Sequence, residues 1–185
     1  MLLVYFGTGK GKTTAAMGVV ARALGRGYRV IVAQFMKAMP SGEAMFYRSS
    51  NYEELLRWFL LGTKEFITHG DITSTPGDIT SDTALVNTAL IYGFLHHILP
   101  KLLEEFRPKL VVLDELGIAT HLGLVDEWSV LEALQPFIGN RERHAIVTGR
   151  YVPSTIRDVA DLVSEVREIK HYFRKGIASL KGIDY

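Results

Sequence analysis

The residues with the clearest chemical potential lie near the start of the chain, in the segment Gly7-Thr8-Gly9-Lys10-Gly11-Lys12-Thr13-Thr14. Glycines let backbone amides turn inward and approach phosphate oxygens closely. A helix that opens at Lys12 would add further amide donors and the partial positive charge of its N-terminus. Lys12 is expected to reach the phosphates as a point charge, and the Thr13 hydroxyl to bind Mg²⁺. The segment therefore predicts a phosphate-binding loop.

The strict pattern for such loops fails at one position. It requires a glycine five places before the glycine of Gly11-Lys12-Thr13, and Phe6 stands there. The alternative interpretation is a flexible turn before a surface helix, with Lys10 and Lys12 merely solvated. We favour the phosphate-binding loop, because an apolar strand precedes the segment and a helical pattern follows it, as the motif demands.

A pair of carboxylates ends a second apolar run. The run Leu110–Leu113 is followed by Asp114-Glu115. Ligands of parallel α/β sheets gather at the carboxyl ends of the strands, where one such carboxylate could hold Mg²⁺ directly or through water. Adjacent residues on a strand point to opposite faces, so only one of the two can bind the metal unless the chain turns there. On its own the pattern also fits the start of a helix.

Hydrophobic periodicity gives the elements that must position these residues. Strands are expected at Leu2–Phe6, Tyr28–Phe35, Leu110–Leu113, Ala145–Thr148 and Leu162–Val166, with a candidate strand at Glu65–Thr68. Helices are expected at Thr13–Leu24, Tyr52–Leu61, Asp82–Phe106 (bent or divided by Pro100), Glu127–Leu134 and Pro153–Ala160. Loops are expected at Met36–Glu43 and His69–Ser81, and an irregular tail at Glu168–Tyr185. This alternation predicts an α/β fold with a mostly parallel sheet and helices on both faces.

Length and composition narrow the class of protein. With 185 residues, of which 48% are hydrophobic and 22% charged, the chain is expected to form a single globular domain over residues 1–185. A net charge of +1 gives no sign of a nucleic-acid partner, and no long apolar run predicts a membrane span. The absence of cysteine excludes disulfides and thiolate metal sites. We expect a cytoplasmic protein.

The motifs together resemble those of the ATP:corrinoid adenosyltransferases, a family of the P-loop NTPase-like (RecA-like) fold. The resemblance rests on five stretches in conserved order along the chain: Gly7–Leu24, Gln34–Lys37 with Ser41–Glu43, Val111–Leu116, Thr148–Arg150, and Asp158–Tyr185 with its ending Lys-Gly-Ile-Asp-Tyr. The closing segment is the most particular of these, since the glycine loop alone is common to many nucleotide enzymes. Members of the family tolerate a residue other than glycine at the position of Phe6.

The resemblance implies a reaction. Cobalt(I) of a corrinoid attacks the ribose 5′ carbon of ATP, and tripolyphosphate leaves, in the biosynthesis or salvage of adenosylcobalamin. Because cobalt(I) is a strong nucleophile, the protein needs no general base, and its tasks are positioning and neutralising the charge of the leaving group. The resemblance makes Lys12 a catalytic residue and Gly9 to Thr14 the phosphate ligands. In this family the nucleotide lies end for end relative to ordinary P-loop enzymes.

The resemblance also assigns individual residues. Thr13 and Glu115 would be the Mg²⁺ ligands, with Asp114 as the alternative. Arg22 matches a family arginine near the nucleotide, although a solvated helix residue is the other interpretation. Gln34–Lys37 and Thr148–Arg150 would border the corrinoid or the ribose, with Arg150 against the nucleotide, although a role in turns is also open.

The chain departs from the family in the segment about Gly62–Gly70. Some members carry a phenylalanine and a tryptophan there that strip cobalt of its lower ligand, and this chain has Phe66 but no tryptophan. Phe66 is a candidate for that catalytic role, and a core phenylalanine is the alternative. Many members have an N-terminal cover over the corrinoid, which we expect to be absent because the first strand starts at Leu2. A homodimer and a reduced flavoprotein partner are expected by resemblance.

Two other functions fit a P-loop. One is a phosphotransferase such as a nucleoside kinase, for which Arg141, Arg143 and Arg150 could act as lid arginines. The other is a nucleotide-binding switch or assembly subunit without chemistry of its own. Adenosyl transfer, phosphate transfer and binding without turnover are distinguishable in one assay with ATP and a reduced corrinoid.

Overall fold

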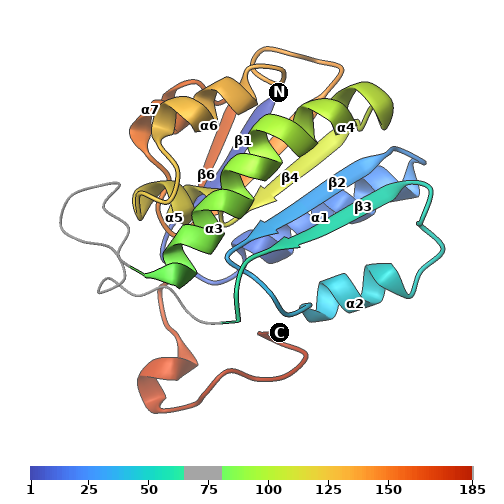
Figure 1. The fold of residues 1–185 in the computed structure, drawn as a ribbon. Helices are drawn as coiled ribbons and strands as arrows, with labels where there is room; N and C mark the ends of the chain where they lie inside the picture. The colour runs from blue at the N-terminus through green and yellow to red at the C-terminus, as the bar shows by residue number, and fades with distance from the viewer. Residues whose placement is uncertain (65–80, 185) are drawn as a thin grey trace.

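A parallel β-sheet forms the centre of the molecule (Figure 1). The computed structural model describes residues 1–64 and 81–184. Within them, six strands pair in the order β3-β2-β4-β5-β1-β6, and neighbouring strands run parallel throughout. The strands are β1 (Leu2–Phe6), β2 (Val30–Phe35), β3 (Leu56–Leu61), β4 (Leu110–Asp114), β5 (His144–Gly149) and β6 (Leu162–Glu165). Their carboxyl ends therefore meet at one edge, where the sequence predicted the site.

Helices cover both faces of this sheet. Those described are α1 (Lys12–Gly25), α2 (Gly42–Arg48), α3 (Asp82–Gly93), the π-helical η2 (Phe94–Ile98), α4 (Leu99–Glu105), α5 (Leu116–His121), α6 (Glu127–Leu134), α7 (Ser154–Asp158) and the 3₁₀ turn η3 (Tyr172–Lys175). The α1 and α2 helices lie on one face, and the layer from α3 to α7 lies on the other (Figure 1). The predicted α/β class, with helices on both faces, is confirmed.

Alternate residues of the central strands supply the two cores. On β2, Val30 and Val32 pack with α1, whereas Ile31 and Ala33 pack with the opposite layer. All six residues of β2 are buried. A strand buried on both faces reads as a continuous apolar run, which explains why the sequence identified the central strands readily.

The expected helix at Tyr52–Leu61 is wrong. Residues Leu56–Leu61 form β3, which pairs with β2 in parallel register from Val30 opposite Leu56 to Phe35 opposite Leu61. Leucine and glutamate favour a helix in isolation, but here the pairing with β2 and the half-buried aromatic side chains outweigh that propensity.

Two short helices lie where none was expected. The α2 helix begins inside the predicted loop Met36–Glu43, capped by the Ser41 hydroxyl, which accepts a hydrogen bond from the Ala44 amide at 3.5 Å. The α5 helix follows β4 directly. Helices of six or seven residues are too short to show a clear period, so tertiary packing specifies them.

The long helical stretch, which Pro100 was expected to bend or divide, runs on without a gap but changes its hydrogen-bond pattern before this residue. The α3 helix passes through the π-helical turns of η2 into α4, and Pro100 lies in the first turn of α4. Proline has no amide donor, so the hydrogen-bond pattern must change just before it. The candidate strand Glu65–Thr68 and most of the expected loop His69–Ser81 lie outside the described residues. In the described part of the chain, no helix is long and apolar enough to cross a membrane.

Candidate active site

The glycine loop is held against the chain that leaves β6. The Gly9 amide donates to the Val166 carbonyl at 2.8 Å, and the Val166 amide donates to the Phe6 carbonyl at 2.7 Å. A Cβ added to Gly7 would lie 2.4 Å from the Val166 carbonyl oxygen, and the φ of Gly7 is +115°. Only glycine fits this approach, so the loop conformation is fixed by its packing before any ligand arrives.

The start of α1 offers a cradle for anions. Gly11 caps the helix with φ +113° and supplies no side-chain hydrogen bond. The first amides of a helix have no partner within it, so those that follow Gly11 can bind an anion. A pocket of about 250 Å³ lies in front of them, lined by residues of the loop (Lys10, Gly11, Lys12, Thr13 and Thr14), by Lys37, Ser41, Glu43 and Glu115, and by Ile183 and Asp184 of the tail. We call it the phosphate pocket.

Asp114 connects the loop to the sheet. This carboxylate is fully buried at the end of β4. Its Oδ1 accepts hydrogen bonds from the hydroxyls of Thr13 at 2.8 Å and Thr148 at 2.7 Å. Its Oδ2 accepts from Gln34 Nε2 at 2.9 Å and from Lys37 Nζ at 3.4 Å. Four donors compensate the loss of hydration, as a buried charge requires.

Glu115 turns out of the strand instead of continuing it. Its φ is +65°, and its amide donates to Thr148 Oγ1 at 2.9 Å. This turn lets both carboxylates lie on the loop's side of the sheet, the exception that the sequence had left open. Burial raises the pKa of Glu115, and the neighbouring charge of Asp114 raises it further, against the opposing effects of Lys37 and Lys12. Within the described residues its carboxylate accepts no hydrogen bond, so its oxygens are available to a ligand.

Lys12 is held beside these groups. Its Nζ donates to the Gly9 carbonyl at 2.7 Å. Burial lowers the pKa of Lys12, and the positive charge of Arg150 lowers it further, while Glu115 and Asp114 partly offset the change. The Arg150 carbonyl accepts from the Gly7 amide at 3.2 Å. The predicted residues Lys12, Thr13 and Glu115 therefore line one pocket, whereas Arg150 is exposed and meets the glycine loop through its carbonyl.

The C-terminal tail closes one side of this pocket. Asp184 accepts hydrogen bonds from Lys10, from the Tyr172 hydroxyl and, at 2.6 Å, from the Leu180 amide. These contacts hold the pKa of Asp184 well below its usual range, the Leu180 amide contributing most. Figure 1 shows the tail passing below the carboxyl edge of the sheet and returning toward it at the C-terminus. The sequence marked this closing segment as distinctive but gave Asp184 no role.

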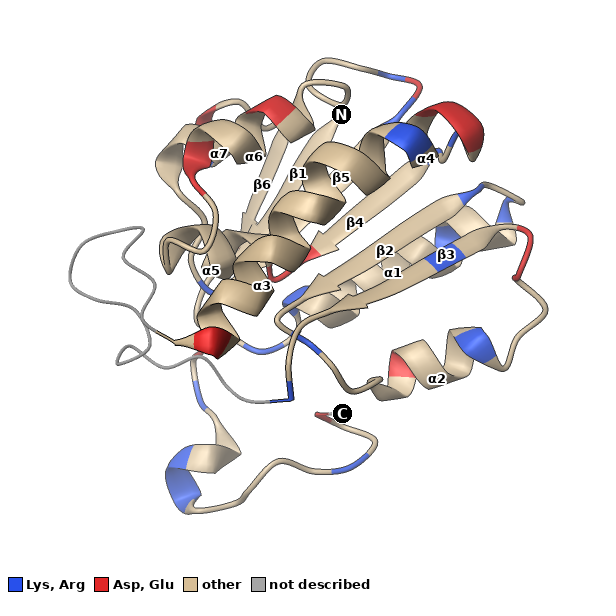
Figure 2. Cartoon of the chain, in the orientation of Figure 1, with Lys and Arg blue, Asp and Glu red and all other residues tan. Residues whose placement is uncertain are grey.

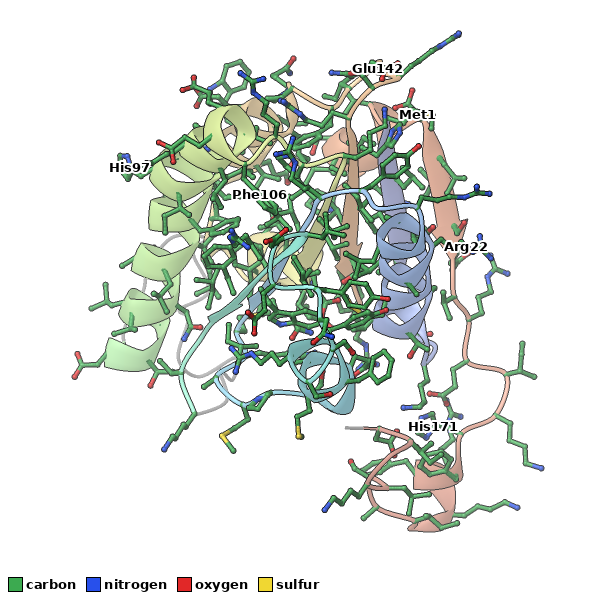
Figure 3. The ribbon with its side chains drawn as sticks, turned by 90° about the vertical axis from the view of Figure 1, so that its right-hand side faces the viewer. Met1, Arg22, His97, Phe106, Glu142 and His171 are labelled. Carbon is green, nitrogen blue, oxygen red and sulfur yellow. The ribbon has the colours of Figure 1, made fainter. Side chains whose placement is uncertain are left out.

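Arg22 is not brought to the pocket. It lies in the last turn of α1, about 15 Å from Lys12 at 1.5 Å per residue. It lines a separate hollow with Met1, Tyr28 and His144 at the opposite edge of the sheet. Figure 3 shows its side chain pointing outward. The expected position beside the nucleotide has no support in this arrangement, and Phe66 lies outside the described residues.

Gln34, Lys37 and Thr148 have a clearer role than the sequence gave them. They were expected to border a substrate, and the structure places all three on Asp114. Trp58 extends the set, because its Nε1 donates to Gln34 Oε1 at 3.1 Å. Their positions at the carboxyl ends of β2 and β5, next to β4, were the signal that could have predicted this contact.

Known proteins with similar sequences carry the name of the family that the motifs of this site resemble. The chain matches, over residues 1–185, the family described as ATP:corrinoid adenosyltransferase BtuR/CobO/CobP. It is 35% identical to a corrinoid adenosyltransferase of Pseudomonas aeruginosa, over 100% of this chain and 83% of the relative. It is 34% identical to the corrinoid adenosyltransferase CobA of Salmonella typhimurium and 33% identical to that of Escherichia coli, each over 100% of this chain and 85% of the relative. With the whole chain matched and the phosphate pocket formed by the motifs that carried the resemblance, this protein belongs to the ATP:corrinoid adenosyltransferase family.

Proposed function

We propose that this enzyme transfers the 5′-deoxyadenosyl group of ATP to the cobalt(I) of a corrinoid, in the biosynthesis or salvage of adenosylcobalamin. The cobalt electron pair forms the new bond to the 5′ carbon, the bond from that carbon to oxygen breaks, and tripolyphosphate leaves with its electrons. The observation that carries the proposal is the phosphate pocket at the start of α1, in a chain that matches this family over its full length.

The residues of the pocket suit the needs of the leaving group. Negative charge grows on the bridging oxygen as the carbon–oxygen bond breaks, and preorganised donors stabilise it most where water is excluded. The half-buried Lys12 and the free amides at the start of α1 supply such donors. The fixed packing of Gly7 and Gly9 holds those donors in place, so no free energy is spent on ordering the loop during reaction.

Magnesium fits the donor set. Thr13 and Glu115 would hold it, while Asp114, whose oxygens already accept four hydrogen bonds, would orient the Thr13 hydroxyl. Magnesium commonly takes one or two carboxylates from a protein and completes its shell with phosphates and water. Bound there, the ion would neutralise charge on the polyphosphate.

One assay tests the proposal. The protein is incubated with ATP, MgCl₂ and chemically reduced cobalamin, and the visible spectrum and tripolyphosphate release are followed. Formation of a light-sensitive cobalt–carbon product together with tripolyphosphate is the expected result. Release of ADP with phosphate transfer would instead support a kinase, and binding without turnover would support a switch. The relatives named above are all adenosyltransferases, so neither alternative is favoured.

The cellular setting is also part of the proposal. Use of ATP supports a cytoplasmic location, and the need for cobalt(I) supports a reduced flavoprotein as the electron donor. A homodimer is supported by the apolar Leu85, Val86 and Ile98, each more than a third exposed on the stretch from α3 to η2. Light scattering on the eluting protein would decide between monomer and dimer.

A further inference from the structure

Strand β6 forms an open edge of the sheet. It is the last strand in the order β3-β2-β4-β5-β1-β6, and among the described strands it pairs with β1 alone (Figure 1). All four of its residues are exposed, and Leu162 and Val163 are each 43% exposed. Figure 2 shows most of β6 without charge, since Glu165 at its end is the one charged residue of the strand. Soluble proteins usually protect such an edge with charges, proline or a covering segment.

The pairing of β6 with β1 decides which of its backbone groups face outward. The Val166 amide donates to the Phe6 carbonyl at 2.7 Å, in the register of the β1–β6 pair. Alternate residues of a strand bond to the same parallel neighbour, so Leu162 and Ser164 also face β1. The amide and carbonyl of Val163 therefore point away from the sheet. Within the described residues, neither has a backbone partner outside the β1–β6 pair.

We infer that a second copy of this chain pairs with β6 in antiparallel orientation about a two-fold axis at Val163, so that the two sheets join into one. Each Val163 amide would donate to the carbonyl of Val163 of the partner subunit, and the Cα atoms of such a pair lie about 5.5 Å apart. Leu162 would lie opposite Ser164 of the partner subunit. The inference rests on the homodimer of the proposed function and names its contact.

The side chains of this edge suit a copy of the same chain. A two-fold contact sets one surface against itself, so its centre must be apolar on both sides. Val163 would meet Val163 there, and Val159, just before the strand, is 38% exposed and adds apolar surface. Leu162 is in register with the half-buried Leu3, which lines an apolar hollow of about 320 Å³ beside α1. The apolar surface thus continues from the strand onto the neighbouring face of the sheet.

The charged residues at the ends of the pair have partners within each copy. Asp161 would lie opposite Glu165 of the partner subunit, and two carboxylates facing each other across strands repel. The Asp161 carboxylate, however, accepts a hydrogen bond from the Leu2 amide at 2.7 Å. Glu165 accepts from Arg167 Nε at 2.8 Å. Each carboxylate therefore enters the contact with a donor of its own.

This contact would act on the phosphate pocket. β6 leads directly into Val166, whose carbonyl accepts from the Gly9 amide at 2.8 Å. Segments with exposed backbone bonds open locally more easily than central ones. A strand on the outer side of β6 would hold this segment in place, and the glycine loop with it. We therefore expect the dimer to bind MgATP more tightly than the monomer.

The first test uses a single introduced thiol, because the chain contains no cysteine. Val163→Cys would place two thiols across the axis, within the Cα separation of about 4.4–6.8 Å that a disulfide requires. Ser164→Cys is the matched control, since the same axis leaves its two Cα atoms about 7–8 Å apart on the diagonal. After treatment with oxidised glutathione, non-reducing electrophoresis should show at least about fivefold more covalent dimer for Val163→Cys than for Ser164→Cys.

The second test measures the dimer in solution by light scattering. The wild type should be a dimer. Val163→Asp should raise the dissociation constant of the dimer at least about 100-fold, because both copies lose an apolar contact and gain facing charges. Leu85→Asp changes a residue that is 53% exposed on α3, the other apolar surface, and should leave the dimer intact. Calorimetry should show about fivefold weaker MgATP binding by the monomeric Val163→Asp protein than by the wild type.

Several outcomes overturn the inference. They are equal cross-linking of the two cysteine variants, a monomeric wild type, and dissociation by Leu85→Asp but not by Val163→Asp. A monomeric Val163→Asp protein that binds MgATP as tightly as the wild type contradicts the effect on the glycine loop. None of these measurements needs a corrinoid. Failure of the cobalamin assay would therefore overturn adenosyl transfer and leave the contact at β6 standing.

Discussion

Thr13 and Asp114, which lie 101 positions apart in the chain, are joined by a hydrogen bond of 2.8 Å from the threonine hydroxyl to the buried carboxylate. This bond links the second residue of α1 to the last residue of β4 at the carboxyl edge of the sheet. It fixes the direction of the Thr13 hydroxyl. The Thr148 hydroxyl donates a second hydrogen bond to the same oxygen of Asp114. The site is thus ordered by protein contacts alone.

Replacing Lys12 by alanine should remove most activity without unfolding the protein. Lys12 is half-buried, and its Nζ bonds to one loop carbonyl, so the fold does not depend on it. Loss of a donor for growing negative charge is expected to lower kcat/KM by about 100- to 1,000-fold. Steady-state kinetics and circular dichroism measure both effects, with Lys101→Ala on α4 as a surface control. Near-normal turnover by a folded Lys12→Ala protein would remove the central assignment.

The two carboxylates should separate in a magnesium titration. Glu115→Gln is expected to raise the MgCl₂ concentration for half-maximal activity at least about tenfold, because it removes a carboxylate with free oxygens. Asp114→Asn should instead lower the stability by about 1–3 kcal/mol, since an amide group would face hydroxyl and ammonium donors in a fully buried position. Thermal unfolding provides the second measurement. A larger magnesium effect for Asp114→Asn would exchange the two roles.

The raised pKa of Glu115 predicts that, in the absence of metal, the Glu115→Gln variant is more stable than the wild type at high pH. Below the usual pKa of a glutamate the side chain is protonated in both folded and unfolded states, so the substitution should be neutral. As pH rises through the folded pKa, the wild type must ionise a buried group beside Asp114 and loses stability that the variant keeps. The variant should then unfold about 2–4 °C higher, the shift that about 1 kcal/mol gives in a chain of this size.

Adding MgATP should reverse that order, because it stabilises the wild type through binding and Glu115→Gln less. Differential scanning at about pH 3.5, below the usual pKa of a glutamate, and at pH 8, with and without MgATP, gives all four comparisons. If the variant is less stable than the wild type in metal-free buffer at pH 8, the ionised Glu115 side chain stabilises the fold instead of lowering its stability.

The sequence predicted the site better than its surroundings, for a physical reason. The loop before α1 and the acidic end of β4 depend on local patterns, namely glycine, lysine and threonine at the start of a helix and a carboxylate after an apolar run. The strand at β3 depends on its partner β2, which no local pattern within Leu56–Leu61 reveals. The turn at Glu115 is likewise set by the Thr148 hydroxyl on another strand.

Contacts between distant segments were the least predictable. Asp184 lies 174 residues from Lys10, and an aspartate near a chain end has no local feature that indicates an ion pair. The same holds for Gln34, whose position at the end of β2 places it beside Asp114 only because β2 and β4 are neighbours in the sheet. Strand order, which periodicity does not give, decides which side chains meet.

Asp184→Asn should release the tail from the phosphate pocket. Its carboxylate gathers Lys10, Tyr172 and the Leu180 amide, and the amide of asparagine would face donors where the carboxylate accepts. Lys181 and Lys175 are exposed on this tail, so limited trypsin digestion at pH 8 should cut the variant there at least about fivefold faster, because the cutting rate follows the population of the released form.

Asp158→Asn, an exposed substitution at the end of α7, controls for the loss of one charge. Because the tail lines the phosphate pocket, bound MgATP should slow the cutting of the wild type. Equal cleavage of wild type and Asp184→Asn would mean that the tail is held by contacts other than this carboxylate.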